Sequence, residues 1–529
     1  MTTRNSPLVT DRSRLFSALE RKQKADLIII GGGATGLGVA LDAVLRGLSV
    51  VLLEAHDLAK GTSSRATKLV HGGVRYLAQG DICLVRQALH ERRQLLRNAA
   101  HLAQPLAFVM PSYSRWEMPF YGLGLNMYDL LAGADGLGHT QVLPKRRVAE
   151  LLPGVRGESL KGGVQYWDGQ FDDARLALTL ARSAAAQGAL ILNYTPVIDV
   201  LHTQGRVSGV RCRDQETGRE YEVHSKCVVN ATGVWVDSIR ELDNDTAGRP
   251  QQSMVSPSQG VHVVVDQEFL GGEHALLIPK TKDGRVLFAV PWLGKLILGT
   301  TDTAVEHTEL EPRALTQEID FILGEAAKYL RRPPQRSDVL SVWAGLRPLV
   351  KPLSNEGTDT KKISREHTIV ISPSGLVSVT GGKWTTYRAM AEDIIKKCSQ
   401  ANLIQVSQPS RTADFRLLGA PLEKAQHSLT QAPGLQAYGS EVDWVQSLPG
   451  ADHELSAGLS EAMVRFACRF EYARTVEDML ARRFRLLFLD AREAARIAPV
   501  VAQIMQDESI ADPQLAQFLA LCETYKLVP

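Results

Sequence analysis

The chain has 529 residues, which is enough for two to four domains that each bury a core. Apolar residues make up 44% and charged residues 22%, and the formal net charge is +2. This composition excludes a disordered or fibrous chain and gives no indication of a nucleic-acid partner. The six cysteines are scattered and form no zinc-like cluster, which predicts reduced thiols and no metal site.

The N-terminal segment and the hydropathy pattern predict no targeting or spanning element. Residues 1–23 are polar and lack the apolar core of a secretory signal, so we expect a loose tail or a short outer helix. No stretch reaches about 18 uninterrupted apolar residues, which argues against a transmembrane helix. These observations favour a cytoplasmic protein and leave attachment to a membrane surface open.

The strongest local pattern lies in residues 26–54, where an apolar run, a glycine cluster, a small-residue helix and a second apolar run follow in order. Gly31, Gly33 and Gly36 supply a G-x-G-x-x-G motif: the first allows a tight turn, the second admits a pyrophosphate, and the third lets the helix pack closely. Glu54 lies where an acid accepts hydrogen bonds from a ribose, which argues against NADP. The pattern predicts a dinucleotide and does not distinguish NAD from FAD.

The segments after this unit predict a binding loop and an aromatic region. Residues 57–81 follow the second strand on the cofactor side of the predicted sheet and are too polar for a core element. The next helix carries a basic face with Arg86, Arg93 and Arg97. Residues 104–131 are dense in aromatic residues, Met, Pro and Gly. They form either a cap or a surface for an apolar partner, and we favour the cap.

The remaining chain has the pattern of an inserted domain and a helical C-terminal region. Short β runs between residues 255 and 344, with one helix near 313–330, predict a mainly antiparallel domain. Residues 227–235 and 376–398 both run from a strand into a glycine turn. We therefore expect both segments to return to the edge of the first sheet. Residues 475–505 are helical in pattern.

Six motifs together resemble the FAD-dependent glycerol-3-phosphate dehydrogenase family. They are IIIGGGATGLGVALDAVLRG (28–47), GTSSRATKLVHGGVRYL (61–77), VVNATGVW (228–235), LGTTDT (298–303), AGLRPL (344–349) and GGKWTTYRAMAE (381–392). The helical TVEDMLARRFRLLFLDA (475–491) is also similar to that family, and the resemblance spans residues 24–505. It implies an α/β plus α fold: a Rossmann-like FAD-binding domain of the glutathione-reductase and amino-acid-oxidase type, an inserted antiparallel β substrate domain and a C-terminal helical domain.

The resemblance also implies a division of the chain and an activity. The implied segments are 24–104, 150–254 and 345–403 for the discontinuous FAD-binding domain, 105–149 for a connecting cap, 255–344 for the substrate domain, 404–439 for a linker and 440–529 for the helical domain. The implied reaction is oxidation of sn-glycerol 3-phosphate to dihydroxyacetone phosphate, with noncovalent FAD accepting a hydride at N5 and a quinone receiving the electrons. Peripheral attachment to the inner face of the cell membrane and a homodimer are compatible with this interpretation.

A phosphate substrate requires cations, and two arginines fit that role. Arg75 and Arg347 are expected to hold the substrate, with Tyr76 assisting. A guanidinium makes a directional two-pronged contact with phosphate, which also fixes the carbon that faces the flavin.

The general base and the flavin contacts are assigned by matching residue chemistry to the demands of the implied reaction. His262 and His71 are alternative bases, because histidine has a suitable pKa near neutrality. Lys383 follows two glycines at a helix start, where it could stabilise the reduced flavin or contact the phosphate. The expected FAD contacts are Gly31, Gly33, Ala34, Thr35, Gly36, Glu54, Thr62, Ser63, Ser64, Lys68, Leu69, His71, Gly72, Val197, Ala231, Thr232, Gly233, Gly382, Lys383 and Thr385.

Two alternative activities remain at this stage. Family members commonly carry a basic residue in a K/R-G-x-H pattern, and this chain has Gln259 at that position. A flavoenzyme for another 2-hydroxy compound, such as a hydroxy acid, is therefore one alternative, since arginines also bind carboxylates. The other alternative is a glycerol-3-phosphate oxidase that uses oxygen. A non-catalytic FAD-binding protein is disfavoured by the full set of candidate catalytic residues.

Overall fold

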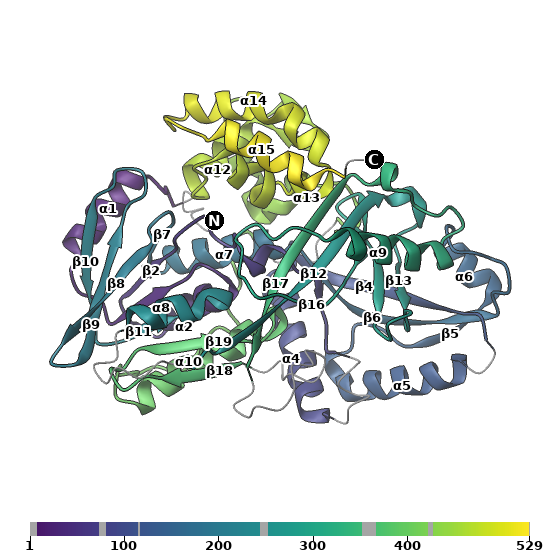
Figure 1. Ribbon diagram of the computed structural model, residues 1–529, viewed down its shortest axis with the longest axis horizontal. Helices are drawn as coiled ribbons and strands as arrows, with labels where there is room; N and C mark the ends of the chain where they lie inside the picture. Colours follow the sequence, from purple (N-terminus) through teal and green to yellow (C-terminus); the bar gives the residue numbers. More distant parts are fainter. Residues whose placement is uncertain are drawn as a thin grey trace, which may run out of the picture.

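The computed structural model describes residues 8–73, 81–114, 117–243, 252–351, 367–421 and 427–527. Figure 1 shows a smaller sheet with its helices on the left, a large sheet on the right and the C-terminal helices above them. The active-site candidates come from the region where these three parts meet. The fold is therefore described from the smaller sheet outward.

The smaller sheet has six strands and carries the predicted dinucleotide motif. In spatial order they are β18 (Thr368–Ile371), β19 (Val377–Thr380), β11 (Val228–Asn230), β1 (Leu27–Ile30), β2 (Val50–Leu53) and β7 (Leu190–Leu192). All neighbours are parallel except β18, which is antiparallel to β19. The carboxyl ends of β1, β11 and β19 consequently meet at one edge of the sheet, as the sequence predicted.

Three helices pack together beside this sheet. They are α2 (Ala34–Leu45), α7 (Asp173–Ala186) and α10 (Tyr387–Gln400), and α2 contacts both of the others. α2 is buried around most of its circumference, which explains why its residues are small and apolar on every face. α7 begins after an N-cap at Asp172, whose carboxylate accepts a hydrogen bond of 3.1 Å from the Arg175 amide.

A three-stranded sheet and a helix lie at the outer end of this part. The strands, in spatial order, are β10 (Glu220–His224), β9 (Arg206–Arg213) and β8 (Val197–Thr203). The N-terminal helix α1 (Arg12–Arg21) buries Phe16 and Leu19 in the same core as these strands. A short outer helix was one of the two forms expected for the N-terminal segment.

The large sheet has ten strands. They are β16 (Thr303–Ala304), β12 (Val255–Asp266), β15 (Lys295–Gly299), β14 (Leu287–Trp292), β13 (Ala275–Ile278), β4 (Ala103–Ser112), β6 (Gly162–Phe171) and β3 (Leu69–Val70), with β17 (Ser341–Val350) paired to β12 and β5 (Gln141–Pro144) to β6. Most neighbours are antiparallel, as predicted for the inserted domain, and β13 runs parallel to β4. The helices associated with it are α4 (Ile82–Asn98), α5 (Glu117–Ala132), α6 (Lys145–Leu151) and α9 (Thr316–Tyr329).

The large sheet crosses the domain division expected from sequence, because β3 and part of β17 belong to it although they lie in the segments expected for the FAD-binding domain. β4 and β6 also belong to it, although residues 24–104 and 150–254 were expected in the FAD-binding domain and 105–149 in a separate cap. The two strands pair antiparallel over ten residues each. Neither local pattern reveals this pairing, because the partners are separated by about fifty residues that include α5 and α6.

The C-terminal region is helical, as expected, and shares its core with residues of the large sheet such as Val264, Trp292 and Trp343. Its elements are α11 (Val442–Gln446), a short hairpin of β20 (Glu454–Ser456) and β21 (Leu459–Ser460), α12 (Glu461–Phe470), the π-helical turn η8 (Asp478–Arg483), α13 (Leu486–Leu489), α14 (Ala491–Asp507) and α15 (Leu515–Tyr525). Phe466, Leu487 and Ile497 are among the residues of this core. Within the described ranges, no helix is long and apolar enough to cross a membrane.

Candidate active site

Three glycine-bearing turns lie together at the carboxyl edge of the six-stranded sheet. Gly31 follows β1, Ala231 follows β11 and Gly382 follows β19. The Ala231 amide donates to the Ile30 carbonyl at 2.8 Å. A side chain at Gly31 would place Cβ 2.7 Å from the Ala231 carbonyl oxygen, and Gly31 has φ +112°. The first two turns therefore touch, and Gly31 must be glycine.

The first turn is shaped to receive a diphosphate. A Cβ at Gly36 would collide with the Gly31 carbonyl oxygen, so this glycine allows α2 to start directly against the turn. The cap residue of α2 is Gly33, which has no side chain to satisfy the first-turn amides. Of these amides, that of Ala34 donates to Ser63 Oγ at 2.9 Å. Helix N-termini with open amides and positive potential bind phosphate groups.

Glu54 is held beside the same turn. Its carboxylate accepts hydrogen bonds from the Gly32 amide at 2.6 Å and the His56 amide at 2.8 Å. Burial raises the pKa of this carboxyl above its ordinary value. The Thr195 amide donates to the Glu54 carbonyl at 2.7 Å, which brings the segment leading to Val197 alongside. This is the place predicted for the ribose and adenine side of the cofactor.

Residues 57–68, which we call the flavin loop, lead from β2 of the smaller sheet to β3 of the large sheet and pass beside the glycine turn. The Ser63 carbonyl accepts a hydrogen bond from the Trp384 indole at 2.9 Å, close to the third turn. Thr62 Oγ1 donates to the Leu346 carbonyl at 2.6 Å. A Cβ at Gly345 would lie 2.7 Å from the Arg65 side chain, so glycine lets the loop cross β17. The predicted contacts Thr62 and Ser63 are thus brought to the cofactor edge.

Lys68 occupies a different environment from the one predicted. Its side chain is fully buried, and its ammonium group donates to both Asp173 oxygens at 2.9 and 2.8 Å and to the Ser64 carbonyl at 2.8 Å. Trp292 and Trp343 pack around it. Burial, followed by the positive charge of Arg485, lowers the pKa of Lys68 to about 7. The ammonium group thus joins the flavin loop to Asp173 at the start of α7.

The segment after β3 packs against the third turn. The Gly72 amide donates to the Tyr128 hydroxyl at 2.9 Å, and a Cβ at Gly72 would collide with that hydroxyl. Thr385 Oγ1 donates to the His71 carbonyl at 3.5 Å. His71 and Thr385 are therefore neighbours, and both are among the predicted FAD contacts. Arg75 and Tyr76 lie outside the described residues.

Lys383 stands at the third turn. It precedes the 3₁₀ turn η6 (Trp384–Thr386) and α10, after Gly381 and Gly382 with φ +82° and +81°. Thr380 Oγ1 donates to the Gly233 carbonyl at 3.3 Å, which ties this turn to the one after β11. The three turns consequently form one continuous edge. The positions predicted for Ala231, Thr232, Gly233 and Lys383 are all on it.

His262 lies on β12 beneath the flavin loop. Its ring stacks on Trp343 with centroids 4.1 Å apart, and Nε2 is 2.9 Å from Thr67 Oγ1. Nδ1 is buried and has no hydrogen-bond partner. Thr67 was not among the predicted site residues. Its place in the loop motif was visible in the sequence, but its partner is 195 residues away.

Arg347 shares a face of the large sheet with His262. Gly260 and His262 point to the same side of β12, and a Cβ at Gly260 would collide with the Arg347 guanidinium. Arg347 donates to the Thr301 carbonyl at 3.0 Å and forms an ion pair with Asp302 at 3.2 Å. Its side chain is 25% exposed. The guanidinium is thus accessible to an anion next to the candidate base.

Gln259 points to the opposite face of β12. Its amide donates to Glu318 at 2.8 Å and to the Arg313 carbonyl at 2.9 Å, and it is buried. Successive strand residues alternate between faces, so residue 259 cannot share the side of Gly260 and His262. The position at which family members carry a basic residue therefore contacts α9 in this chain, and it does not lie on the face that carries Arg347.

These residues fit FAD. The glycine turn and the open amides of α2 suit a diphosphate, and Glu54 suits a ribose. The edge formed by the second and third turns, from Ala231 to Thr385, suits the remainder of the cofactor. The chain matches the model of the FAD dependent oxidoreductase family over residues 26–392 and that of the C-terminal domain of alpha-glycerophosphate oxidase over residues 379–514. Fold, site and match together define an FAD-dependent oxidoreductase.

Individual relatives narrow this class. The chain is 40% identical to the mitochondrial glycerol-3-phosphate dehydrogenase of Homo sapiens, over 94% of this chain and 72% of that protein. It is 38% identical to the mitochondrial enzyme of Arabidopsis thaliana, over 98% and 89%. The structure of the glycerol-3-phosphate dehydrogenase from Bacillus halodurans complexed with FAD matches with a TM-score of 0.75 and 32% identity, over 97% and 96%. The chain belongs to the FAD-dependent glycerol-3-phosphate dehydrogenase family.

Proposed function

We propose that this chain oxidises sn-glycerol 3-phosphate to dihydroxyacetone phosphate and passes the electrons to a quinone at a membrane surface. The observation that carries the proposal is the common face of Arg347 and His262 beside the flavin loop. When bound, FAD supplies the hydride acceptor at N5. The substrate must therefore be held with its phosphate on Arg347 and its hydroxyl towards a base.

The chain's own residues divide the work between binding and proton transfer. The Arg347 guanidinium is partly exposed and binds the phosphate, with Asp302 fixing its orientation. Burial, followed by the charges of Lys68 and Arg347, holds the pKa of His262 well below its ordinary value. The imidazole is therefore neutral near pH 7, which is the protonation state that a general base requires. Lys383 adds positive charge at the third turn.

The test of the proposed function is anaerobic bleaching of the enzyme-bound flavin. Glycerol 3-phosphate should bleach the flavin of the purified holoenzyme, and a hydroxy acid such as lactate should not. Reoxidation should then require a quinone analogue. Bleaching by the hydroxy acid alone would contradict the substrate, and rapid reoxidation in aerated buffer without a quinone would indicate an oxidase.

Replacement of His262 by alanine should lower the bleaching rate by about 100- to 10,000-fold, the usual contribution of a general base. The expected cause is loss of the proton acceptor, so the FAD content should remain that of the unmodified enzyme. The measurement is the limiting rate of anaerobic bleaching at saturating substrate. His71→Ala is the comparison: a larger loss there than at His262 would make His71 the base.

An apolar stripe on α5 supports attachment to a membrane surface. Its members, Phe120, Leu123, Met127 and Leu130, are 75%, 69%, 48% and 81% exposed, and Val142 of β5 lies beside them at 60%. Large exposed apolar patches mark interaction sites. α6 begins next to this stripe with Lys145, Arg146 and Arg147, and the two arginines form ion pairs with Glu150. The helix α5 lies below the large sheet in Figure 1, on the side away from the C-terminal helices.

The basic face predicted on α4 contributes less to this surface than expected. Arg93 forms an ion pair with Asp135, and Arg97 forms one with Asp414. Both arginines are therefore at least partly neutralised within the protein. The membrane proposal consequently depends on the apolar stripe of α5 rather than on the arginines of α4.

Substitution of Leu123 and Leu130 by aspartate should lower binding to anionic vesicles by about tenfold or more, because burial of each leucine contributes about 1.5–3 kcal/mol. Co-sedimentation with vesicles measures the bound fraction, and detergent-solubilised activity should be unchanged. The matched control replaces Val370 and Ile371, exposed apolar residues of β18. Equal loss in the control, or none in the α5 variant, would contradict the assignment.

A further inference from the structure

The C-terminal region carries three buried arginines whose role the candidate active site does not explain. Arg482 and Arg483 end the π-helical turn η8, and Arg485 follows it. They are 3%, 3% and 1% exposed. Arginine is almost never fully buried unless its charge is paired, so the partners of these side chains indicate what the motif does.

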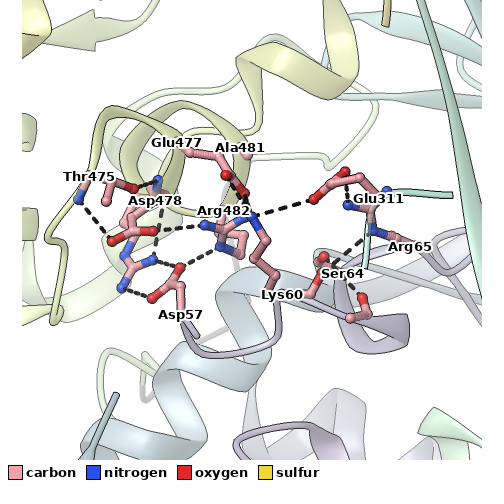
Figure 2. A network of polar contacts seen from close by, with 12 residues as sticks. Asp57, Lys60, Ser64, Arg65, Glu311, Thr475, Glu477, Asp478, Ala481 and Arg482 are labelled. Atoms are coloured by element: carbon pink, nitrogen blue, oxygen red, sulfur yellow. Dashed lines mark hydrogen bonds and ion pairs between the residues drawn. The ribbon is translucent and has the colours of Figure 1, made fainter. Parts of the chain in front are cut away.

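The first two arginines hold the start of the flavin loop. Arg483 donates to one Asp57 oxygen at 2.9 Å, and Arg482 and Arg483 both donate to the other. Burial by itself would raise the pKa of Asp57, but the two guanidinium groups hold it below its ordinary value, so the carboxylate is charged. Figure 2 shows Arg482 between Asp57 and the acids Glu477 and Asp478 of its own region.

Arg485 holds the loop at Ser64. Its guanidinium donates to the Ser64 carbonyl at 2.7 Å and pairs with Asp173 at 3.2 Å. Arg485 has φ 70°, a left-handed conformation that is uncommon for a residue with a side chain and that the surrounding packing must impose. Ser64 is adjacent to Ser63, which lies at the cofactor edge. The Ser63 hydroxyl accepts a hydrogen bond from the Ala34 amide, and the Ser63 carbonyl accepts one from the Trp384 indole.

Further charged contacts hold the middle of the loop. Lys60 donates to Glu477 at 2.6 Å, and Arg65 donates to Glu311 at 2.6 Å. Figure 2 shows these two pairs as one chain of contacts from the C-terminal turn to the loop. Lys60 also lies 3.4 Å from Glu311. The C-terminal region thus holds the loop at several positions, and Glu311 of the large-sheet domain is a further partner. None of the predicted cofactor contacts lies in the C-terminal region.

We propose that Arg485 is a positioning residue for FAD: with Arg482 and Arg483 it fixes the flavin loop at Ser64 and Asp57, and so sets the affinity for the cofactor. The inference rests on the proposed function only in taking FAD as the ligand of this loop. If these arginines only joined the domains, replacement of any buried arginine at the junction would weaken FAD binding equally. Arg182 of α7 is equally buried and joins the same region through Glu441, at 2.6 and 2.7 Å, without touching the loop.

The experiment is titration of full-length apoprotein with FAD, followed by flavin fluorescence in the absence of substrate. Arg485→Met should raise the dissociation constant by about tenfold or more, because it leaves buried acceptors without their partner. Arg485→Lys should recover part of the affinity, and Arg182→Met should stay within about twofold of the unmodified chain. Unchanged binding by Arg485→Met, or an equal loss in Arg182→Met, would overturn the proposal.

Hydrogen exchange of the unmodified apoprotein decides the matter if Arg485→Met does not fold. Peptides covering residues 57–66 and 478–488 should exchange at similar rates, because the proposal makes them one cooperative unit. Fast exchange of the loop with continued protection of 478–488 would overturn it. Neither measurement uses glycerol 3-phosphate, so a failure of the proposed reaction would leave both results interpretable.

Discussion

Replacement of Arg347 by methionine is expected to lower kcat/KM for glycerol 3-phosphate by about 100- to 10,000-fold, with the FAD content unchanged. The physical reason is the loss of two charge-assisted hydrogen bonds to the phosphate, each of which contributes about 1.5–3 kcal/mol. The guanidinium lies over Gly260 on the face that carries His262, away from the glycine turns. The loss should therefore appear in the substrate dependence of anaerobic flavin bleaching.

Two comparison variants make this prediction specific. Arg347→Lys should recover part of the lost affinity, because an ammonium group keeps the charge but not the planar two-pronged contact. Arg336→Met removes another arginine of the large-sheet domain, one that pairs with Asp320 at 2.6 Å. This surface variant should bleach at the normal rate. Normal bleaching by Arg347→Met would show that the phosphate binds elsewhere.

The Gly36→Ala variant should lose FAD during purification and unfold at a lower temperature than the unmodified chain. The added Cβ would collide with the Gly31 carbonyl oxygen and lie 3.3 Å from the Ile29 side chain. Helix α2 must then move away from β1, which removes the close approach of its amides to a diphosphate. Overpacking of this kind typically costs about 1–3 kcal/mol of stability. Flavin absorbance per protein and thermal unfolding measure the two effects.

Gly324 provides the matched control, because it is also a helical glycine. It lies in α9, and a Cβ there would meet no atom within 4 Å. Gly324→Ala should therefore leave FAD binding unchanged and stabilise the protein by about 0.5–1 kcal/mol. Retention of FAD by Gly36→Ala at normal stoichiometry would mean that the helix tolerates displacement, and that the glycine is not required for the cofactor.

Much of the cofactor edge could be predicted because its signals are local. The turn of Gly31 needs a positive φ, and the packing of α2 needs Gly36, so these requirements appear as glycines at a fixed spacing. The same logic placed the later turns at Ala231 and Gly382. Parallel strands necessarily end at one edge, so three strand–glycine patterns were sufficient to predict a common site.

The substrate side was only partly predictable. His262 and Arg347 were identified as candidates, but the position of Thr67 against His262 and the burial of Lys68 on Asp173 were not. The effect of Gln259 was also invisible, because it depends on which face of β12 holds α9. Each of these contacts joins residues far apart in the chain, and no local periodicity encodes such pairings.

By itself, the sequence determined that this protein binds a dinucleotide on a parallel sheet, has an antiparallel insertion and ends in helices. These features follow from short-range rules: glycine spacing, apolar periodicity and helix caps. Only the tertiary structure decided that β4 and β6 join the large sheet, and that Arg485 reaches a loop 421 residues earlier in the chain. Such contacts form because buried charges and strand edges must find partners, and the partner is selected by the packing of whole domains. The opening motif thus specifies the cofactor's diphosphate, while the packing of the other two domains shapes the loop beside it.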